Sequence, residues 1–169
     1  WEDFRKDNAL TILDRYSSVL PSFNDDIQGT GAVVMAGLNS ALTIKGETLA
    51  AQRIVVFGAG AAGLGVARQI KAQLVDESIV GEAQTAVVAV LDRGGLLVDD
   101  GRPMDDYKHE IAWPVERAAK LGLAEPTSRS LYDVVRKYRP TVLIGLSGVA
   151  RSFNEKIVRE MAEHVDRPI

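Results

Sequence analysis

Residues 53–63 read Arg-Ile-Val-Val-Phe-Gly-Ala-Gly-Ala-Ala-Gly and carry the strongest signal for the fold. The β-branched run at 53–57 predicts a short parallel strand that is buried on both faces. The glycines that follow match the pattern G-x-G-x-x-G, in which the first, Gly58, permits a tight turn from strand to helix. The second, Gly60, lets the backbone approach a pyrophosphate, and the third, Gly63, lets helix and strand pack closely. We therefore predict a dinucleotide-binding turn formed by Gly58, Ala59, Gly60, Ala61, Ala62 and Gly63.

A second buried strand is predicted at residues 86–91, and Asp92 follows it directly. A carboxylate at the end of this strand accepts hydrogen bonds from the adenosine ribose hydroxyls, which favours NAD. Asp92 lies farther from Gly58 than the usual gap of about 20 residues. The polar segment 76–85, interpreted as an insertion, accounts for the excess. Arg93 comes next and could pair with a 2′-phosphate, so NADP stays possible.

Helices alternate with strands through the rest of this region, which predicts an α/β fold with a doubly wound parallel sheet of Rossmann type. A third buried strand is expected at 141–145, and residues 93–129 are less regular. The predicted helices cover 61–75, 130–138 with Ser130 as N-cap, and 155–164 with Asn154 as N-cap.

Helical segments precede this fold. A helix is predicted at 4–20, followed by a polar loop at 22–28. A second helix at 29–44 is apolar almost all round, so we expect it to be buried on most sides, with Gly46 as its C-terminal cap. We accordingly divide the chain into a helical segment, 1–46, and a Rossmann-type NAD-binding domain, 47–169.

Composition excludes several classes of function. The chain has 169 residues and a net charge of −3, without a basic cluster, which argues against nucleic-acid binding. It has no cysteine and two histidines, so thiolate catalysis, iron–sulfur clusters and multi-histidine metal sites are excluded. The chain has no uninterrupted apolar run of about 18 residues, so the sequence predicts no membrane span. The absence of cysteine fits a reducing compartment, and we expect a cytoplasmic protein. Both ends look like cuts inside a longer protein.

Two acidic doublets, Glu2-Asp3 and Asp25-Asp26, flank the first predicted helix. If the chain doubles back, the doublets can meet, and three or four carboxylates together would require a neutralising cation. Carboxylate oxygens select hard ions such as Mg²⁺ or Mn²⁺. Solvated doublets with no ligand are the alternative interpretation of the same residues.

Several blocks together resemble the malic enzyme family over nearly the whole chain. They are Trp1-Glu2-Asp3-Phe4 with Asn8-Ala9, Phe23-Asn24-Asp25-Asp26-Ile27-Gln28-Gly29-Thr30, Gly58-Ala59-Gly60, Asp92-Arg93-Gly94-Gly95-Leu96-Leu97, and 140–148 (PTVLIGLSG). The resemblance implies that Glu2, Asp3 and Asp26 are metal ligands and that Asp25 is an acidic residue that supports catalysis. It also implies that Asp92 contacts the ribose, and that Ser147 and Gly148 run along the cofactor.

The activity that this resemblance implies is oxidative decarboxylation of L-malate to pyruvate and CO₂, with NAD and Mg²⁺ or Mn²⁺, in a homo-oligomeric enzyme. The family's tyrosine acid, lysine base and malate-binding arginine match nothing in this chain, so we expect the chain alone to be inactive. Three alternatives remain open. The first is malolactic enzyme, which makes lactate; Gly31 in the stretch GTGAV is slightly similar to that enzyme's sequence. The second is a nucleotide-binding module without turnover, and the third is an unrelated dehydrogenase domain.

Overall fold

The computed structural model describes all of residues 1–169 and contains a central sheet of four strands in the order β3-β2-β1-β6. Strand β1 (Ile54–Phe57) lies between β2 (Val88–Asp92) and β6 (Val142–Gly145) and is parallel to both. The two-residue β3 (Gly95–Leu96) pairs antiparallel with β2 at the edge. The predicted parallel sheet is therefore confirmed, with one short antiparallel strand added.

The start of the second strand differs from the prediction. Helix α4 (Gly81–Val87) occupies part of the segment that was interpreted as a polar insertion, and it includes Ala86 and Val87. Strand β2 consequently begins at Val88 and ends with Asp92 as its last residue. The apolar run alone did not reveal this boundary, because short buried helices and strands share the same composition.

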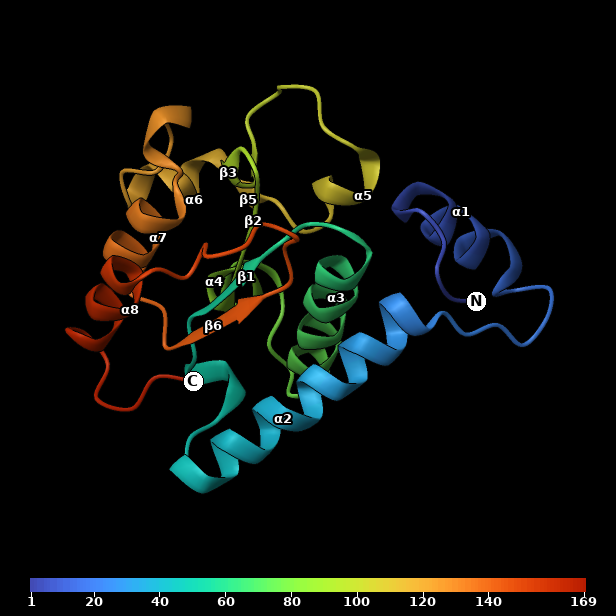
Figure 1. Cartoon of the computed structure of the whole chain (residues 1–169), viewed down its shortest axis with the longest axis horizontal. Helices are drawn as coiled ribbons and strands as arrows, with labels where there is room; N and C mark the ends of the chain where they lie inside the picture. Colours follow the sequence, from blue (N-terminus) through green and yellow to red (C-terminus); the bar gives the residue numbers. More distant parts are fainter.

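Helices cover both faces of the sheet, as Figure 1 shows. Helices α2 (Thr30–Lys45) and α3 (Ala61–Asp76) lie on one side. Helices α7 (Leu131–Tyr138) and α8 (Glu155–Ala162) lie on the other. Because side chains alternate along a strand, Ile54 and Val56 enter the core under α3, whereas Val55 enters the opposite core. All three are fully buried, which confirms the predicted burial on both faces.

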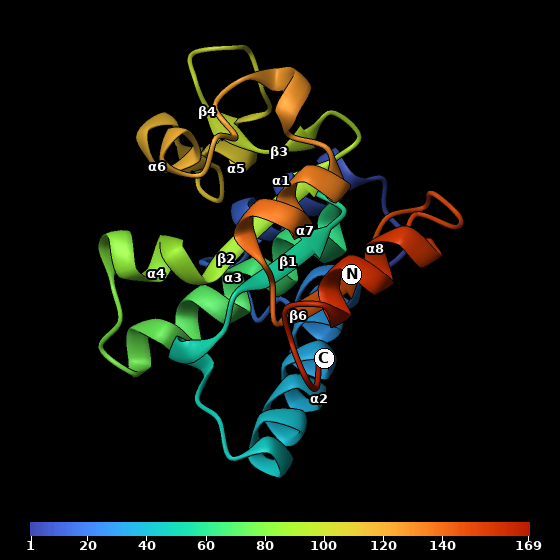
Figure 2. The same cartoon turned by 90° about the vertical axis from the view of Figure 1, so that its left-hand side faces the viewer.

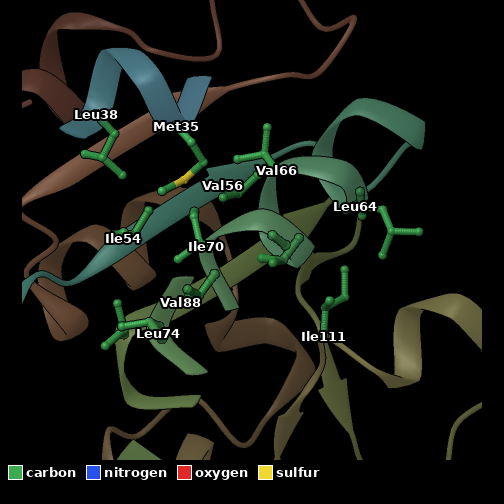
Figure 3. Close-up of a cluster of buried hydrophobic side chains, with 14 of the residues drawn as sticks. Met35, Leu38, Ile54, Val56, Leu64, Val66, Ile70, Leu74, Val88 and Ile111 are labelled. Carbon is green, nitrogen blue, oxygen red and sulfur yellow. The ribbon is translucent and has the colours of Figure 1, made fainter. Parts of the chain in front are cut away.

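Figure 3 shows how the first of these cores is built. Met35 and Leu38 descend from α2 toward the sheet, and Val66 and Ile70 come from α3. These side chains meet the strand residues in one continuous apolar cluster. Helix α2 is thus joined to the central sheet by a shared core.

The prediction that α2 is buried on most sides is wrong. Only Gly31, Met35, Leu38 and Leu42 are buried. Val33 and Ile44 are each 74% exposed, because α3 and the sheet contact only one face of the helix. The continuous helical stretch Asp25–Lys45 has 21 residues and contains an 18-residue window with a mean hydropathy of 1.2, which by length and composition alone would suit a membrane span. The core helix of a globular domain passes the same test, so this is weak evidence for a span.

The N-terminal region folds back beside α3. Helix α1 (Lys6–Tyr16) is shorter than the predicted helix at 4–20, and its Leu10 and Leu13 enter the first core. Figure 1 places α1 beyond the start of α2. Part of the predicted polar loop is instead a π-helical turn, η1 (Asp25–Gly29), which continues directly into α2.

The remaining elements connect these layers, and Figure 2 shows the connection between β2 and α7 at the upper edge of the molecule. They are the 3₁₀ turns η2 (Leu49–Ala51) and η3 (Pro126–Ser128), the short helices α5 (Asp106–His109) and α6 (Val115–Lys120), and the paired strands β4 (Val98–Asp99) and β5 (Trp113–Pro114). The predicted caps are confirmed: Gly46 is left-handed after α2, and Ser130 and Asn154 accept backbone N–H groups at α7 and α8.

Candidate functional site

Each glycine of the turn after β1 sits where its predicted role requires it. Gly58 has φ 129°, and a Cβ there would lie 2.5 Å from the carbonyl carbon of Leu146. A Cβ on Gly63 would lie 1.6 Å from the carbonyl oxygen of Gly58, so the helix can approach the turn only without a side chain. Nothing lies within 4 Å of a Cβ on Gly60. Gly60 therefore leaves open space for a ligand, whereas the other two permit close packing.

Helix α3 begins immediately after Gly60, which is its N-cap. The first backbone bond at this end runs from Leu64 N to the Gly60 carbonyl oxygen. The N–H groups of the preceding residues are left without acceptors inside the helix, as at every helix start. Together with the positive end of the helix dipole, these groups suit a bound phosphate.

A cleft of about 380 Å³ opens in front of this turn. Seven of the residues predicted to contact the cofactor line it, namely Gly58, Ala59, Gly60, Asp92, Arg93, Ser147 and Gly148. Ala61, Ala62 and Gly63 are not among its lining residues. The cleft is also lined by residues that sequence reasoning missed: Lys6, Phe57, Lys108, Leu146 and Val149. The cofactor roles of the predicted residues stay predictions, but their convergence on one cleft at the carboxyl edge of the sheet is a property of the fold.

Asp92 is held by two contacts within the chain. Its Oδ1 accepts a hydrogen bond from Gly94 N at 2.7 Å, and its Oδ2 lies 2.7 Å from the Nζ of Lys108 in α5. Burial works to lower the pKa of Lys108, but the hydrogen bond and the charge of Asp92 outweigh it and raise the pKa. The cleft therefore presents a carboxylate and an ammonium side by side. No motif marks Lys108, because it comes from the irregular region that follows β2.

A further group of charges joins α1 to the same edge. Lys6 Nζ lies 3.1 Å from Asp105 Oδ2 and 4.8 Å from the ring centre of Tyr107. The Tyr107 hydroxyl donates to the same carboxylate oxygen at 2.6 Å. The hydroxyl first and Lys6 second lower the pKa of Asp105 to about 2. Because Lys108 also lies 3.6 Å from Asp105, charged side chains run continuously from α1 to Asp92.

The η1 turn places the second acidic doublet, and Asn24 holds it. Asn24 is fully buried, and its Oδ1 accepts from Ile27 N at 3.0 Å. Gln28 Oε1 in return accepts from Asn24 N at 2.9 Å. The side-chain Nδ2 of Asn24 is buried without a partner. Single π-turns of this kind are frequent at functional sites, and this one carries Asp25 and Asp26.

The structure brings the two acidic doublets together. The amino group of Trp1 donates to the Phe23 carbonyl oxygen at 2.7 Å, and Asp25 N donates to the Trp1 carbonyl oxygen at 2.9 Å. Asp3 N donates to Asp26 Oδ2 at 2.8 Å. The chain therefore doubles back, which is the condition under which the two doublets can meet. The donor set consists of carboxylate oxygens, which suits Mg²⁺ or Mn²⁺ by its chemistry.

The side chains of Glu2, Asp3 and Asp26 do not close into one coordination sphere. The one group of three acidic or histidine ligand atoms within 4.8 Å of one another is Glu160, Glu163 and His164, on and just after α8. Glu2 and Asp3 are exposed, and Asp3 has φ 60°. The metal role of the three predicted ligands therefore stays a prediction, with the segments adjacent and the carboxylates apart.

A parallel sheet with helices on both faces, and a glycine turn opening onto a cleft, define a dinucleotide-binding domain of Rossmann type. Residues 27–169 match the family model described as "Malic enzyme, NAD binding domain". The chain belongs to this family.

The curated relatives carry consistent names. The chain is 43% identical to an NAD-dependent malic enzyme from Photorhabdus laumondii over all of its own length and 30% of that protein. It is 41% identical to NAD-dependent malic enzyme 3 from Bacillus subtilis, covering 99% of this chain and 30% of the relative. The chain therefore spans less than a third of the length of these relatives.

Solved structures support the fold. The NAD-dependent malic enzyme from Thermotoga maritima aligns with 86% of this chain and 35% of its own, with a TM-score of 0.63 and 27% identity. The malic enzyme from Entamoeba histolytica covers 97% of this chain and 31% of its own, with a TM-score of 0.71 at 24% identity, which bears on the fold alone.

Proposed function

We propose that this chain is the NAD-binding part of an enzyme that oxidatively decarboxylates L-malate to pyruvate and CO₂. The observation that carries the proposal is that two features share helix α3. The η1 turn, whose Asp26 accepts a bond from Asp3 N, packs against this helix, and the dinucleotide cleft opens at its start. A hydroxy acid that loses a hydride from C2 and CO₂ from C3 needs a hydride acceptor facing C2 and an electrophile at the C2 oxygen. The two features supply sites for these groups.

In this proposal the residues of this chain bind the cofactor and orient it toward malate. The turn at Gly58–Gly63 would receive the pyrophosphate, Asp92 would accept from the adenosine ribose, and Ser147 and Gly148 would run along the cofactor. A bound nicotinamide would accept the hydride from malate C2, while the hydroxyl proton leaves to a base. The bond from C3 to the carboxyl carbon breaks to release CO₂, its electron pair forms the enolate between C2 and C3, and a general acid returns a proton to C3 to give pyruvate. Asp25, beside the candidate metal ligands, supports the transfer of the hydroxyl proton.

Glu2, Asp3 and Asp26 are the residues that would hold Mg²⁺ or Mn²⁺. When bound, such a cation acts as a Lewis acid toward the C2 oxygen of malate. Hydrogen bonds already join the two segments, and the three carboxylates would converge when the cation binds. NAD is the proposed acceptor, in line with the names of the relatives, and NADP is the second candidate because Lys108 and Arg93 flank Asp92.

The names of the relatives favour malic enzyme over the malolactic alternative. The two reactions differ in product, since malolactic conversion ends at lactate with no net formation of NADH. We also propose that the enzyme is a homo-oligomer, which light scattering of the purified protein tests directly.

The deciding experiment incubates the protein at its natural length with L-malate, NAD and Mn²⁺. We expect NADH, pyruvate and CO₂ in equal amounts. Lactate without net NADH would favour the malolactic reaction. Binding of NAD without any malate-dependent product would favour a nucleotide-binding module, and turnover of another substrate without a metal would favour an unrelated dehydrogenase.

A further inference from the structure

Two glycines outside the dinucleotide motif lie where backbones touch directly. A Cβ built on Gly65 in α3 would lie 2.0 Å from the carbonyl oxygen of Ile27 and 2.7 Å from its carbonyl carbon. A Cβ on Gly31 would lie 2.8 Å from Gln69 Cγ and 3.1 Å from the Gly65 carbonyl oxygen. Helix α3 therefore meets the η1 turn and the start of α2 without a side chain between the backbones.

This absence of side chains is specific to the contact. Gly37 lies on the same helix as Gly31, and a Cβ there would have nothing within 4 Å. Gly65 is buried among the core residues of α3, and Ile27 is only 2% exposed. The obstacle to a side chain at Gly65 is backbone rather than the flexible end of a side chain, so neither partner can yield by changing a rotamer.

The position of this contact relates it to both halves of the site. Ile27 follows Asp26 directly, and its amide is held by Asn24. Gly65 lies five residues after Gly60, which is about 7.5 Å along a helix at 1.5 Å per residue. The turn that carries the carboxylates is thus seated on the same rigid helix whose first turn faces the dinucleotide cleft.

We propose that Gly65 is a positioning residue, which fixes the distance of Asp25 and Asp26 from the bound dinucleotide. This inference rests on the proposed function. A methyl group at position 65 would push the η1 turn outward by about 1 Å, because a carbon and an oxygen in contact stay more than 3 Å apart. Displacements of about 1 Å at an active site can lower turnover by about a hundredfold.

The test compares Gly65→Ala with Gly37→Ala in the protein at its natural length. Both variants add one methyl group to a helix. For Gly65→Ala we expect kcat with malate to fall by about thirtyfold to a hundredfold, while the Kd for NAD, measured by calorimetry, changes by less than about threefold. For Gly37→Ala we expect both quantities to stay within about twofold of the wild type.

A second readout uses neither metal nor malate. Hydrogen exchange at the amides of Ile27 and Gln28, both bonded to Asn24, should be at least about tenfold faster in Gly65→Ala than in Gly37→Ala. Unchanged exchange together with unchanged kcat would overturn the inference. Equal losses of NAD affinity and turnover would also overturn it, because they would indicate a general defect of the fold.

If Gly65→Ala does not fold, Gly31→Ala decides, because a methyl group there lies 3.1 Å from the Gly65 carbonyl oxygen, which is a milder form of the same backbone contact, while the Gln69 side chain can move aside. We expect its kcat to be about fivefold lower with unchanged NAD affinity, and wild-type kcat would reject the inference. A wild-type protein that binds NAD but does not act on malate would reject the proposed function instead. The exchange comparison would then still test whether Gly65 seats the η1 turn.

Discussion

Asp92 shows how one residue serves both the fold and the cleft. Its two carboxylate oxygens hold Gly94 N and Lys108 Nζ, and a carboxylate has about four lone-pair sites, so it can still accept from a ribose. The same ammonium and the neighbouring Arg93 are cations that a 2′-phosphate would meet. Cofactor choice at this position is therefore a balance between one carboxylate and two cations.

Replacing Asp92 with asparagine should shift that balance. We expect kcat/KM for NAD to fall by roughly tenfold to a hundredfold, because a charged acceptor is lost. NADP should gain relative to NAD, because Lys108 and Arg93 then face the 2′-phosphate without an opposing carboxylate. The measurement is kcat/KM with each cofactor, with Asp76→Asn, an exposed site at the end of α3, as the control. A ratio that stays at the wild-type value would show that Asp92 does not face the ribose.

A substitution at Gly60 should change cofactor binding without changing the stability of the fold. A Cβ at this position meets no protein atom, so Gly60→Ala should leave the thermal midpoint within about 2 °C of the wild type. The methyl group would instead project into the space predicted for the pyrophosphate, and we expect the Kd for NAD to rise about tenfold or more. Gly148→Ala, also in open space, tests whether the second half of the cleft approaches the cofactor as closely. Unchanged affinity for NAD in Gly60→Ala would show that the pyrophosphate does not bind at this turn.

Asp26 is the candidate metal ligand whose position is best defined, because it lies in η1 and accepts a bond from Asp3 N. Asp26→Asn keeps its size and one carbonyl oxygen but removes a charge. The Mn²⁺ concentration for half-maximal activity should rise by about tenfold or more, since carboxylate charge tunes the affinity for hard cations. Titration with Mn²⁺ measures this, with Asp14→Asn on the exposed face of α1 as the control. A wild-type titration curve would mean that Asp26 is not a ligand.

At the scale of elements, α3 organises the site. Its first turn faces the dinucleotide cleft, its Gly65 meets η1, and its apolar face packs on β1 and β2. The η1 turn in turn depends on Asn24, which caps it from inside the core. The carboxylates are therefore placed by a cap and a contact between two backbones, both of which lie outside the acidic residues themselves.

Removal of this cap should affect function more than removal of an equivalent cap elsewhere. Asn24→Ala and Asn154→Ala each delete an Oδ1 that accepts from the N–H three residues later. We expect each to lower the free energy of unfolding by about 1 kcal/mol. Urea unfolding measures that quantity, and only Asn24→Ala should also reduce malate turnover and weaken Mn²⁺ binding. Equal turnover in the two variants would show that η1 does not position the site.

At the scale of the whole molecule, the connection from β2 to α7 contains a buried charged side chain, that of Arg129. The Arg129 side chain is 2% exposed and lies 2.8 Å from Asp100 Oδ2, while it donates to the Leu123 carbonyl oxygen at 3.0 Å. The hydrogen bond from Arg102, and then Arg129, hold the pKa of Asp100 well below its usual range. A carboxyl whose pKa is lower in the folded state stabilises the fold above its unfolded pKa of about 4, and that contribution is lost as pH falls further.

Stability should therefore decrease on acidification from about pH 4 downward, and Asp100 should account for part of the slope. Asp100→Asn leaves Arg129 without its charge partner, so we expect a loss of roughly 3 kcal/mol at neutral pH and a shallower dependence below pH 4. Urea unfolding across this range measures both effects. The control is Asp99→Asn, whose side chain is 53% exposed. An unaltered slope in Asp100→Asn would assign the acid sensitivity to other carboxylates.

Local patterns in the sequence predict those features that involve residues close together in the chain. The β-branched run before Gly58, the glycine spacing and the caps Ser130 and Asn154 predicted the parallel sheet and its helices, because strand burial, turn geometry and capping involve neighbours in the chain. The block at residues 23–30 indicated the family before any fold was known. Burial of α2 on most sides was predicted wrongly, because composition shows that a face is apolar and not whether anything covers it.

The residues that share the cleft, and the way in which the acidic doublets meet, are evident only in the folded chain. Lys108 reaches Asp92 from a short helix, and Trp1 pairs with Phe23 through backbone atoms that carry no sequence signal. The role of Gly65 was likewise invisible, because a helical glycine reads as a mild loss of propensity until a second backbone is found against it. These contacts join segments far apart in the chain, and their geometry follows from the packing of whole elements, which no local pattern encodes.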